Sequence, residues 1–97
     1  MICVRCIVTG RVQGVFYRAS TRNKAVELNL CGYVRNLIDG SVEVVARGDE
    51  ISLREFKDWL WLGPMYAKVS NVSCEAITEA AENLSDKYSE SDGFEVI

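Results

Sequence analysis

The stretch from Gly10 to Thr21 constrains the fold of this chain most. A β-branched, apolar run ends at Gly10, a loop leads to Gly14, and helix-compatible sequence begins around Phe16. A strand that enters a helix through a short loop brings backbone N–H groups and a helix N-terminus together, and such a cluster binds anions. Arg18 would lie in the first helical turn, where its planar guanidinium can hold two oxygens of a phosphoryl group. The stretch predicts a phosphate site, although glycines that only form a turn and a solvated arginine would leave the same pattern.

Two sequence blocks carry a resemblance to a known family. The string GRVQGVFYRAST, residues 10–21, resembles a signature of the acylphosphatase family, G-x-V-Q-G-V-x-[FY]-R-x-x-T, in every fixed position. The string GYVRNLIDGSVE, residues 32–43, is similar to the family's other signature, G-[WY]-V-x-N-x-x-D-G-x-V-E. The resemblance covers roughly residues 2–77 and is poor in the C-terminal fifth of the chain.

Length, charge and hydropathy limit the class of partner. The 97 residues predict a single domain, residues 1–97. No apolar run approaches the roughly 20 residues of a membrane span, and no signal-peptide pattern opens the chain, so we expect a cytoplasmic protein without a membrane partner. Residues 1–35 hold six basic side chains and one acidic one, a net charge of +5, whereas residues 36–97 hold five basic and thirteen acidic ones, a net charge of −8. This favours a small anion over nucleic acid, and we expect a monomer.

The chain has four cysteines and no histidine. Without an export signal, we expect the thiols to be reduced and to pack as small apolar side chains. Cys3-x-x-Cys6 is spaced like half a zinc site, but neither Cys31 nor Cys74 has a partner two residues away, so we expect no metal and no cofactor. Because the fourth strand would lie beside the first, a disulfide from Cys74 to Cys3 or Cys6 is left open.

Hydrophobic periodicity predicts a ferredoxin-like βαββαβ fold of the α+β class, with two helices on one face of a mainly antiparallel sheet. The expected strands are 2–9, 32–37, 41–47 and 67–77, with a bulge in the last and a short edge strand at 94–97. Residues 16–28 should form the first helix, with Ala19 and Val26 on its buried face together with Ala25, Leu28 and Leu30. The second helix should start at a capping box, Ser52-x-x-Glu55, and stop at Gly63. Residues 78–92 should form a solvated connection.

The two signatures should meet at one edge of the sheet. A strand–helix–strand crossover returns the second strand parallel to the first, so Asn36 would emerge next to the loop that precedes Arg18. Asn36 shares its side of the strand with Val34, which is expected to face the core, and a purely structural strand would more often carry an apolar side chain there. An asparagine that satisfies loose backbone at the strand end is the alternative.

The predicted site lacks a nucleophile–base pair and a carboxylate in the first signature. General-base catalysis, which contributes ~10²- to 10⁴-fold to the rate, is therefore missing. The substrate must then have a leaving group that departs without protonation by the protein. A carboxyl–phosphate anhydride meets this condition because its carboxylate needs no proton.

The resemblance implies the hydrolysis of acyl phosphates, without metal or covalent intermediate. It implies that Arg18 binds the phosphoryl group, that Asn36 orients water, and that Thr21 supports the geometry. Inorganic phosphate would bind as product or inhibitor. The backbone amides of the implied phosphate cradle belong to Gln13, Gly14, Val15, Phe16, Tyr17 and Arg18. An anion-binding module on the same fold, or a piece of a larger carbamoyl-transfer protein, is the alternative.

Overall fold

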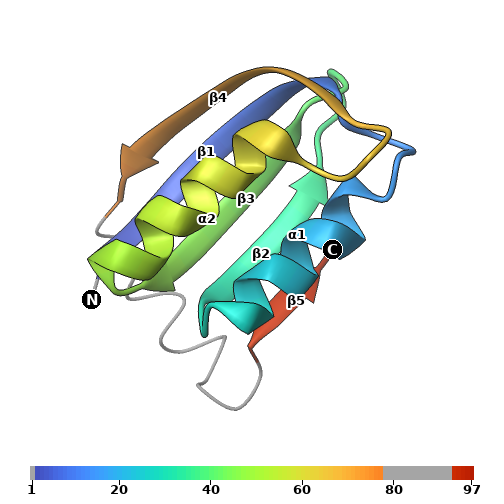
Figure 1. The fold of residues 1–97 in the computed structure, drawn as a ribbon. Coiled ribbons are helices and arrows are strands. Elements are labelled where there is room, and N and C mark those ends of the chain that lie inside the picture. The colour runs from blue at the N-terminus through green and yellow to red at the C-terminus, as the bar shows by residue number, and fades with distance from the viewer. Residues whose placement is uncertain (1, 78–92) are drawn as a thin grey trace.

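The computed structural model describes residues 2–77 and 93–97, in which two helices cover one face of a five-stranded sheet (Figure 1). The elements are β1 (Ile2–Arg11), α1 (Tyr17–Glu27), β2 (Cys31–Asn36), β3 (Val42–Gly48), α2 (Glu50–Leu62), β4 (Lys68–Ala76) and β5 (Phe94–Val96). The strand order is β4-β1-β3-β2-β5. Neighbouring strands are antiparallel except β2 and β5, which are parallel. The ferredoxin-like α+β fold and the extra edge strand are confirmed, and the connection expected at 78–92 falls outside the described residues.

The strand β1 shows the expected alternation. Its even-numbered residues face the helices, and Val4, Cys6 and Val8 are buried, whereas Ile2, on the same side, is 40% exposed where the strand begins. The other face of the sheet carries a small apolar cluster of Cys3 and Val45, with partly buried neighbours Tyr33 and Ile77. The main core therefore lies between the sheet and the two helices.

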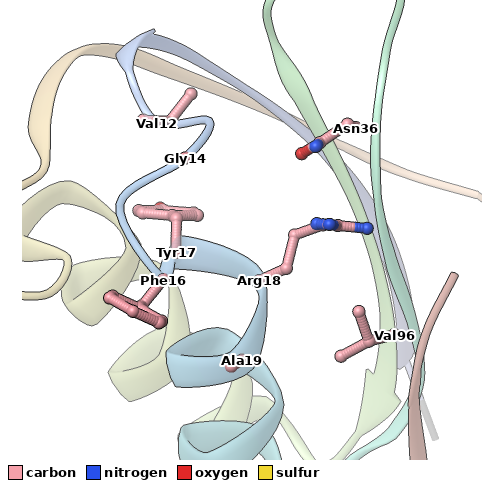
Figure 2. A pocket seen from close by; sticks show the side chains of 8 residues that line it. All are labelled: Val12, Gly14, Phe16, Tyr17, Arg18, Ala19, Asn36 and Val96. Carbon is pink, nitrogen blue, oxygen red and sulfur yellow. The ribbon is translucent and has the colours of Figure 1, made fainter.

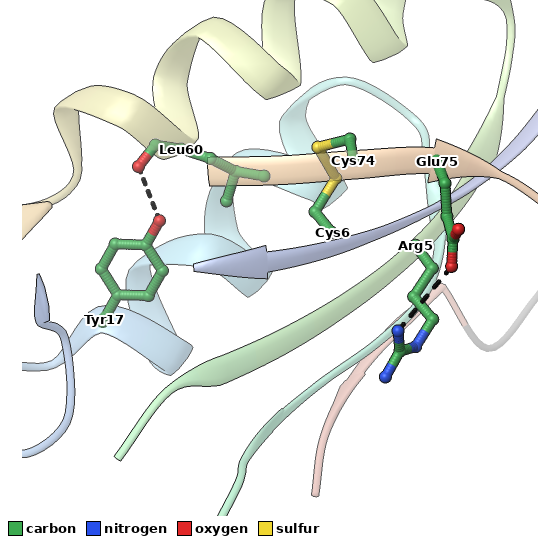
Figure 3. Close-up of a disulfide and its surroundings, with 6 residues drawn as sticks. All are labelled: Arg5, Cys6, Tyr17, Leu60, Cys74 and Glu75. Atoms are coloured by element: carbon green, nitrogen blue, oxygen red, sulfur yellow. Dashed lines mark hydrogen bonds and ion pairs between the residues drawn. A yellow bond between two sulfur atoms is a disulfide. The ribbon is translucent and has the colours of Figure 1, made fainter. Parts of the chain in front are cut away.

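The buried face of α1 differs from the prediction. Ala25 is buried as expected, but Ala19 and Val26 are exposed, and the residues that share the buried face with Ala25 are Tyr17 and Thr21. The polar end of Tyr17 explains the difference, because its hydroxyl donates a hydrogen bond to the backbone oxygen of Leu60 at 2.7 Å (Figure 3). This bond lets the whole ring enter the core, where it lies 5.9 Å from the Trp59 ring.

The helix α2 begins earlier than the capping box suggested. Its N-cap is Asp49, whose carboxylate accepts a hydrogen bond from the Ser52 amide at 2.8 Å, so the prediction that Ser52 starts the helix is wrong. The buried residues of α2 are Leu53, Phe56 and Leu60.

The expected bulge in β4 is present. Thr9 pairs with Asn71 but Gly10 pairs with Val69, so Ser70 is the extra residue. Gly10 has φ 120°, and a β-carbon there would lie 2.2 Å from the Lys68 oxygen, so only glycine fits against the bulge.

Cys6 and Cys74 face each other on β1 and β4 and form a disulfide (Figure 3), with their α-carbons 4.0 Å apart. The expectation that the thiols are reduced is wrong for this pair, because the antiparallel register places the two residues directly opposite each other. Cys3 and Cys31 are free.

The face of the sheet away from the helices carries a buried ion pair. Glu43 is 3% exposed and accepts hydrogen bonds from Arg5 at 2.6 Å and from Arg35 at 2.5 Å. Burial raises the pKa of Glu43, but the hydrogen bonds and charges of the two arginines outweigh it and hold the pKa below its ordinary value.

Candidate active site

A pocket opens where the loop after β1 meets the end of β2 (Figure 2). Its volume is about 300 Å³. The residues that line it are Val12, Gly14, Phe16, Tyr17, Arg18, Ala19, Asn36 and Val96. The structure thus brings Arg18 and Asn36 to one pocket, because β1 and β2 both run antiparallel to the β3 strand between them and so point in the same direction.

The β1–α1 loop leaves the first amides of α1 available. Gly14 has φ 74° and Phe16, the N-cap of α1, has φ 62°, so the backbone takes a left-handed conformation at both residues. The Phe16 side chain makes no capping hydrogen bond, and the first turn contains no acidic residue. A β-carbon added to Gly14 would meet nothing within 4 Å, so the loop backbone is open to a ligand. Such a row of N–H groups at a helix start suits an oxyanion.

The Arg18 side chain runs from α1 towards β2, between Asn36 and Val96 (Figure 2). Its Nη1 donates a hydrogen bond to the backbone oxygen of Ile97 at 2.8 Å. This bond orients the guanidinium, and a side chain that is already ordered loses less conformational entropy when it binds a ligand.

Gln13 connects the two halves of the site. Its Nε2 donates hydrogen bonds to the backbone oxygens of Leu37 and Ser41, both at 2.9 Å, so the loop before α1 is tied to the β2–β3 turn that follows Asn36. The side chain of Gln13 therefore acts as a strut, and nothing in the sequence pattern alone indicated this role. Gln13 and Val15 do not line the pocket, and Val15 is buried.

The turn after Asn36 is held by its own hydrogen bonds. The Asp39 carboxylate accepts from the Ser41 hydroxyl and from the Ser41 amide, and both bonds lower the pKa of Asp39. Leu37 donates its amide to the Ser41 oxygen at 2.8 Å. A turn closed in this way keeps the end of β2, and with it Asn36, in one place.

Tyr17 and Thr21 lie on the buried face of α1, and of the two only Tyr17 lines the pocket. Burial raises the pKa of Tyr17, which stays a neutral hydrogen-bond donor to Leu60 and anchors the helix start to α2. Thr21 is 0% exposed, and its Oγ1 has no hydrogen-bond partner among the described residues. It does not line the pocket, so its supporting role stays a prediction.

Other features of the described residues bear on ligands. Within 2–77 and 93–97, no three His, Cys, Asp or Glu side chains gather as metal ligands would. No helix in this part of the chain is long and apolar enough to cross a membrane.

The comparisons with known proteins agree with this fold and give its family. A model of the acylphosphatase family matches residues 4–95. An acylphosphatase of Nitrosococcus oceani is 51% identical over 75 residues, which are 77% of this chain and 84% of that protein. The solved acylphosphatase of Coxiella burnetii has a TM-score of 0.85 at 45% identity, over 99% of this chain and 92% of that one. The Bacillus subtilis acylphosphatase structure has a TM-score of 0.85 at 31% identity, over 100% and 99%.

Fold and pocket define a ferredoxin-like α+β domain with a pocket at the start of its first helix. The family match and the identity to the relatives specify it further, and the chain belongs to the acylphosphatase family. It is therefore a hydrolase that acts on acyl phosphates.

Proposed function

We propose that this chain hydrolyses acyl phosphates by direct attack of an oriented water on phosphorus, without a metal ion and without a covalent intermediate. The observation that carries the proposal is the presence of Arg18, Asn36 and uncapped helix amides in one pocket. In this proposal the amides of residues 13–18 and the Arg18 guanidinium bind the phosphoryl oxygens, and the Asn36 amide holds the water. Location in the cytoplasm and a monomeric state stay predictions.

The reaction needs no proton from the protein. The water oxygen forms a bond to phosphorus while the bond from phosphorus to the carboxyl oxygen breaks, and the carboxylate leaves with the electron pair. The proton of the water moves to a phosphoryl oxygen, and the products are a carboxylate and inorganic phosphate. The residues that line the pocket offer a cation and hydrogen-bond donors but no carboxylate, imidazole or thiol. Catalysis then comes from positioning and from electrostatic stabilisation of the phosphoryl charge.

The geometry supports this mechanism in two ways. The hydrogen bonds of Gln13 fix the loop that binds phosphate to the turn beside Asn36, so the two halves of the site keep one spacing. The bond from Arg18 to Ile97 holds the guanidinium in place. A site that is rigid before binding reorganises little as charge develops.

Phosphate release from acetyl phosphate, measured with a chelator in excess, tests the proposal. We expect full activity in chelator and none on an ordinary phosphate monoester such as 4-nitrophenyl phosphate, because a poor leaving group requires a general acid that the pocket does not provide. Hydrolysis carried out in ¹⁸O-labelled water should place one labelled oxygen in the phosphate and none in acetate. Loss of activity in chelator, or label in acetate, would refute the mechanism.

A further inference from the structure

Packing does not explain the conformation of Phe16. Its φ of 62° lies in the left-handed region, which strains a bulky side chain and which glycine adopts freely. Its backbone oxygen accepts a hydrogen bond from the Ser20 amide at 3.0 Å, as an N-cap residue of any type would. Its side chain is 78% exposed and caps no helix amide, so neither side-chain burial nor a side-chain hydrogen bond offsets the strain. Asn29, the other described non-glycine residue with positive φ, follows the end of α1, where asparagine commonly terminates helices. Strain of this kind often marks a residue that contacts a ligand.

The pocket indicates which part of a substrate Phe16 would meet. Figure 2 shows Asn36 and Phe16 on opposite sides of Arg18, with the ring of Phe16 pointing away from Asn36. In phosphoryl transfer the attacking and leaving oxygens lie roughly in line through phosphorus. If the water lies at Asn36, the leaving carboxylate and its acyl group extend away from Asn36, towards the side on which Phe16 projects.

We propose that the Phe16 ring contacts the acyl group of the substrate, and that the enzyme prefers acyl phosphates with an apolar or aromatic acyl group. This inference rests on the proposed function. An exposed ring beside a phosphate site gives an aryl or alkyl group a surface on which to stack or to remove apolar area from water. Met65 and Tyr66, on the loop that begins at Gly63, are also exposed apolar side chains, and Gly63 lies against the ring of Tyr17.

The test compares kcat/KM for benzoyl phosphate with kcat/KM for acetyl phosphate in the wild type and in Phe16→Ala, Phe16→Gly and Phe16→Tyr. Differences in chemical reactivity between the two substrates cancel when each variant's ratio is divided by the wild-type ratio. Loss of the ring should lower the benzoyl-to-acetyl ratio about tenfold in both Phe16→Ala and Phe16→Gly. A change that affects kcat/KM for both substrates equally does not alter this ratio. Phe16→Tyr keeps the ring and should keep the ratio.

The two ring-deleting variants separate the contact from the strain. Glycine relaxes the left-handed backbone and alanine does not, so Phe16→Gly should have the higher Tm while both lose the same selectivity. Ile51→Ala is a matched control because Ile51 is also 78% exposed but lies in the first turn of α2 and does not line the pocket. It should leave both kcat/KM values unchanged.

The outcomes distinguish this inference from the proposed function. Turnover of acetyl phosphate by the wild type with an unchanged ratio in Phe16→Ala would overturn the role of Phe16 alone. A ratio that falls in Phe16→Gly but not in Phe16→Ala would assign the effect to the backbone and overturn it as well. A wild type that hydrolyses neither substrate would overturn the proposed function, and this inference with it.

Discussion

Reduction of the Cys6–Cys74 disulfide should cost this domain a large part of its stability. The two cysteines are 68 residues apart in the sequence, so the bond closes a loop over most of the chain. Closing such a loop restricts the unfolded chain, and its removal should lower the free energy of unfolding by about 4 kcal/mol at 25 °C. Small domains have only about 5–15 kcal/mol in total. For a chain of 97 residues the loss corresponds to a Tm lower by about 20 °C.

Urea unfolding with and without dithiothreitol, followed by tryptophan fluorescence, measures this difference, and thiol counting by mass spectrometry confirms the redox state. Cys74→Ala should reproduce the effect of reduction without a reductant. Cys31→Ala is the control, because Cys31 is a free thiol and its loss should leave the effect of reduction intact. Neither disulfide cysteine lines the pocket, so the reduced, folded protein should retain its kcat. Equal urea midpoints for the oxidised and reduced protein would refute the reasoning.

Arg18→Lys should lower kcat/KM for acetyl phosphate at least ~100-fold, since an ammonium cannot make two parallel contacts; near-normal turnover would remove Arg18 from phosphate binding. Asn36→Ala should reduce kcat far more than it weakens competitive inhibition by inorganic phosphate, and the opposite pattern would make Asn36 a binding residue. Thr21→Val should raise the free energy of unfolding in urea by about 1 kcal/mol, because it removes a buried hydroxyl that has no hydrogen-bond partner within residues 2–77 and 93–97; a decrease would contradict this. Glu43→Gln should be less stable than the wild type at neutral pH. Because the pKa of Glu43 is held below its ordinary 4.5, that stability difference should shrink as the pH falls from about 4.5 through the lowered pKa, and a difference independent of pH would refute the assignment.

The strands were predictable because alternation in β1 reports burial directly. Val4, Cys6 and Val8 recur at the period of a strand with one face in the core, and each is buried. The shift of parity in β4 likewise revealed the bulge at Ser70. In these segments the local pattern and the tertiary packing favour the same structure, so the sequence alone was sufficient to predict the strands.

The face of α1 was not predictable in this way. Apolar periodicity favoured Ala19 and Val26, but the helix turns Tyr17 and Thr21 inward because a hydrogen bond to Leu60, remote in sequence, satisfies the tyrosine. Similarly, the capping box Ser52-x-x-Glu55 did not set the start of α2, because Asp49, three residues earlier, is the N-cap.

The candidate site was likewise only partly predictable from the sequence. The crossover rule for parallel strands was enough to place Asn36 beside Arg18. The strut from Gln13 to Leu37 and Ser41, and the bond from Arg18 to Ile97, join segments 24 to 79 residues apart and depend on side-chain reach that no local pattern encodes.

The bond between Arg18 and the Ile97 oxygen has a practical consequence for handling the protein. Figure 1 shows the C-terminal end of β5 beside α1, and the start of β1 at the end of that strand away from the β1–α1 loop. The ten residues of β1 span about 30 Å. An affinity tag joined after Ile97 would leave the domain past the guanidinium and crowd the mouth of the pocket. A tag placed before Ile2 keeps clear of it, so activity should be compared between proteins tagged at either end before a low rate is attributed to the enzyme.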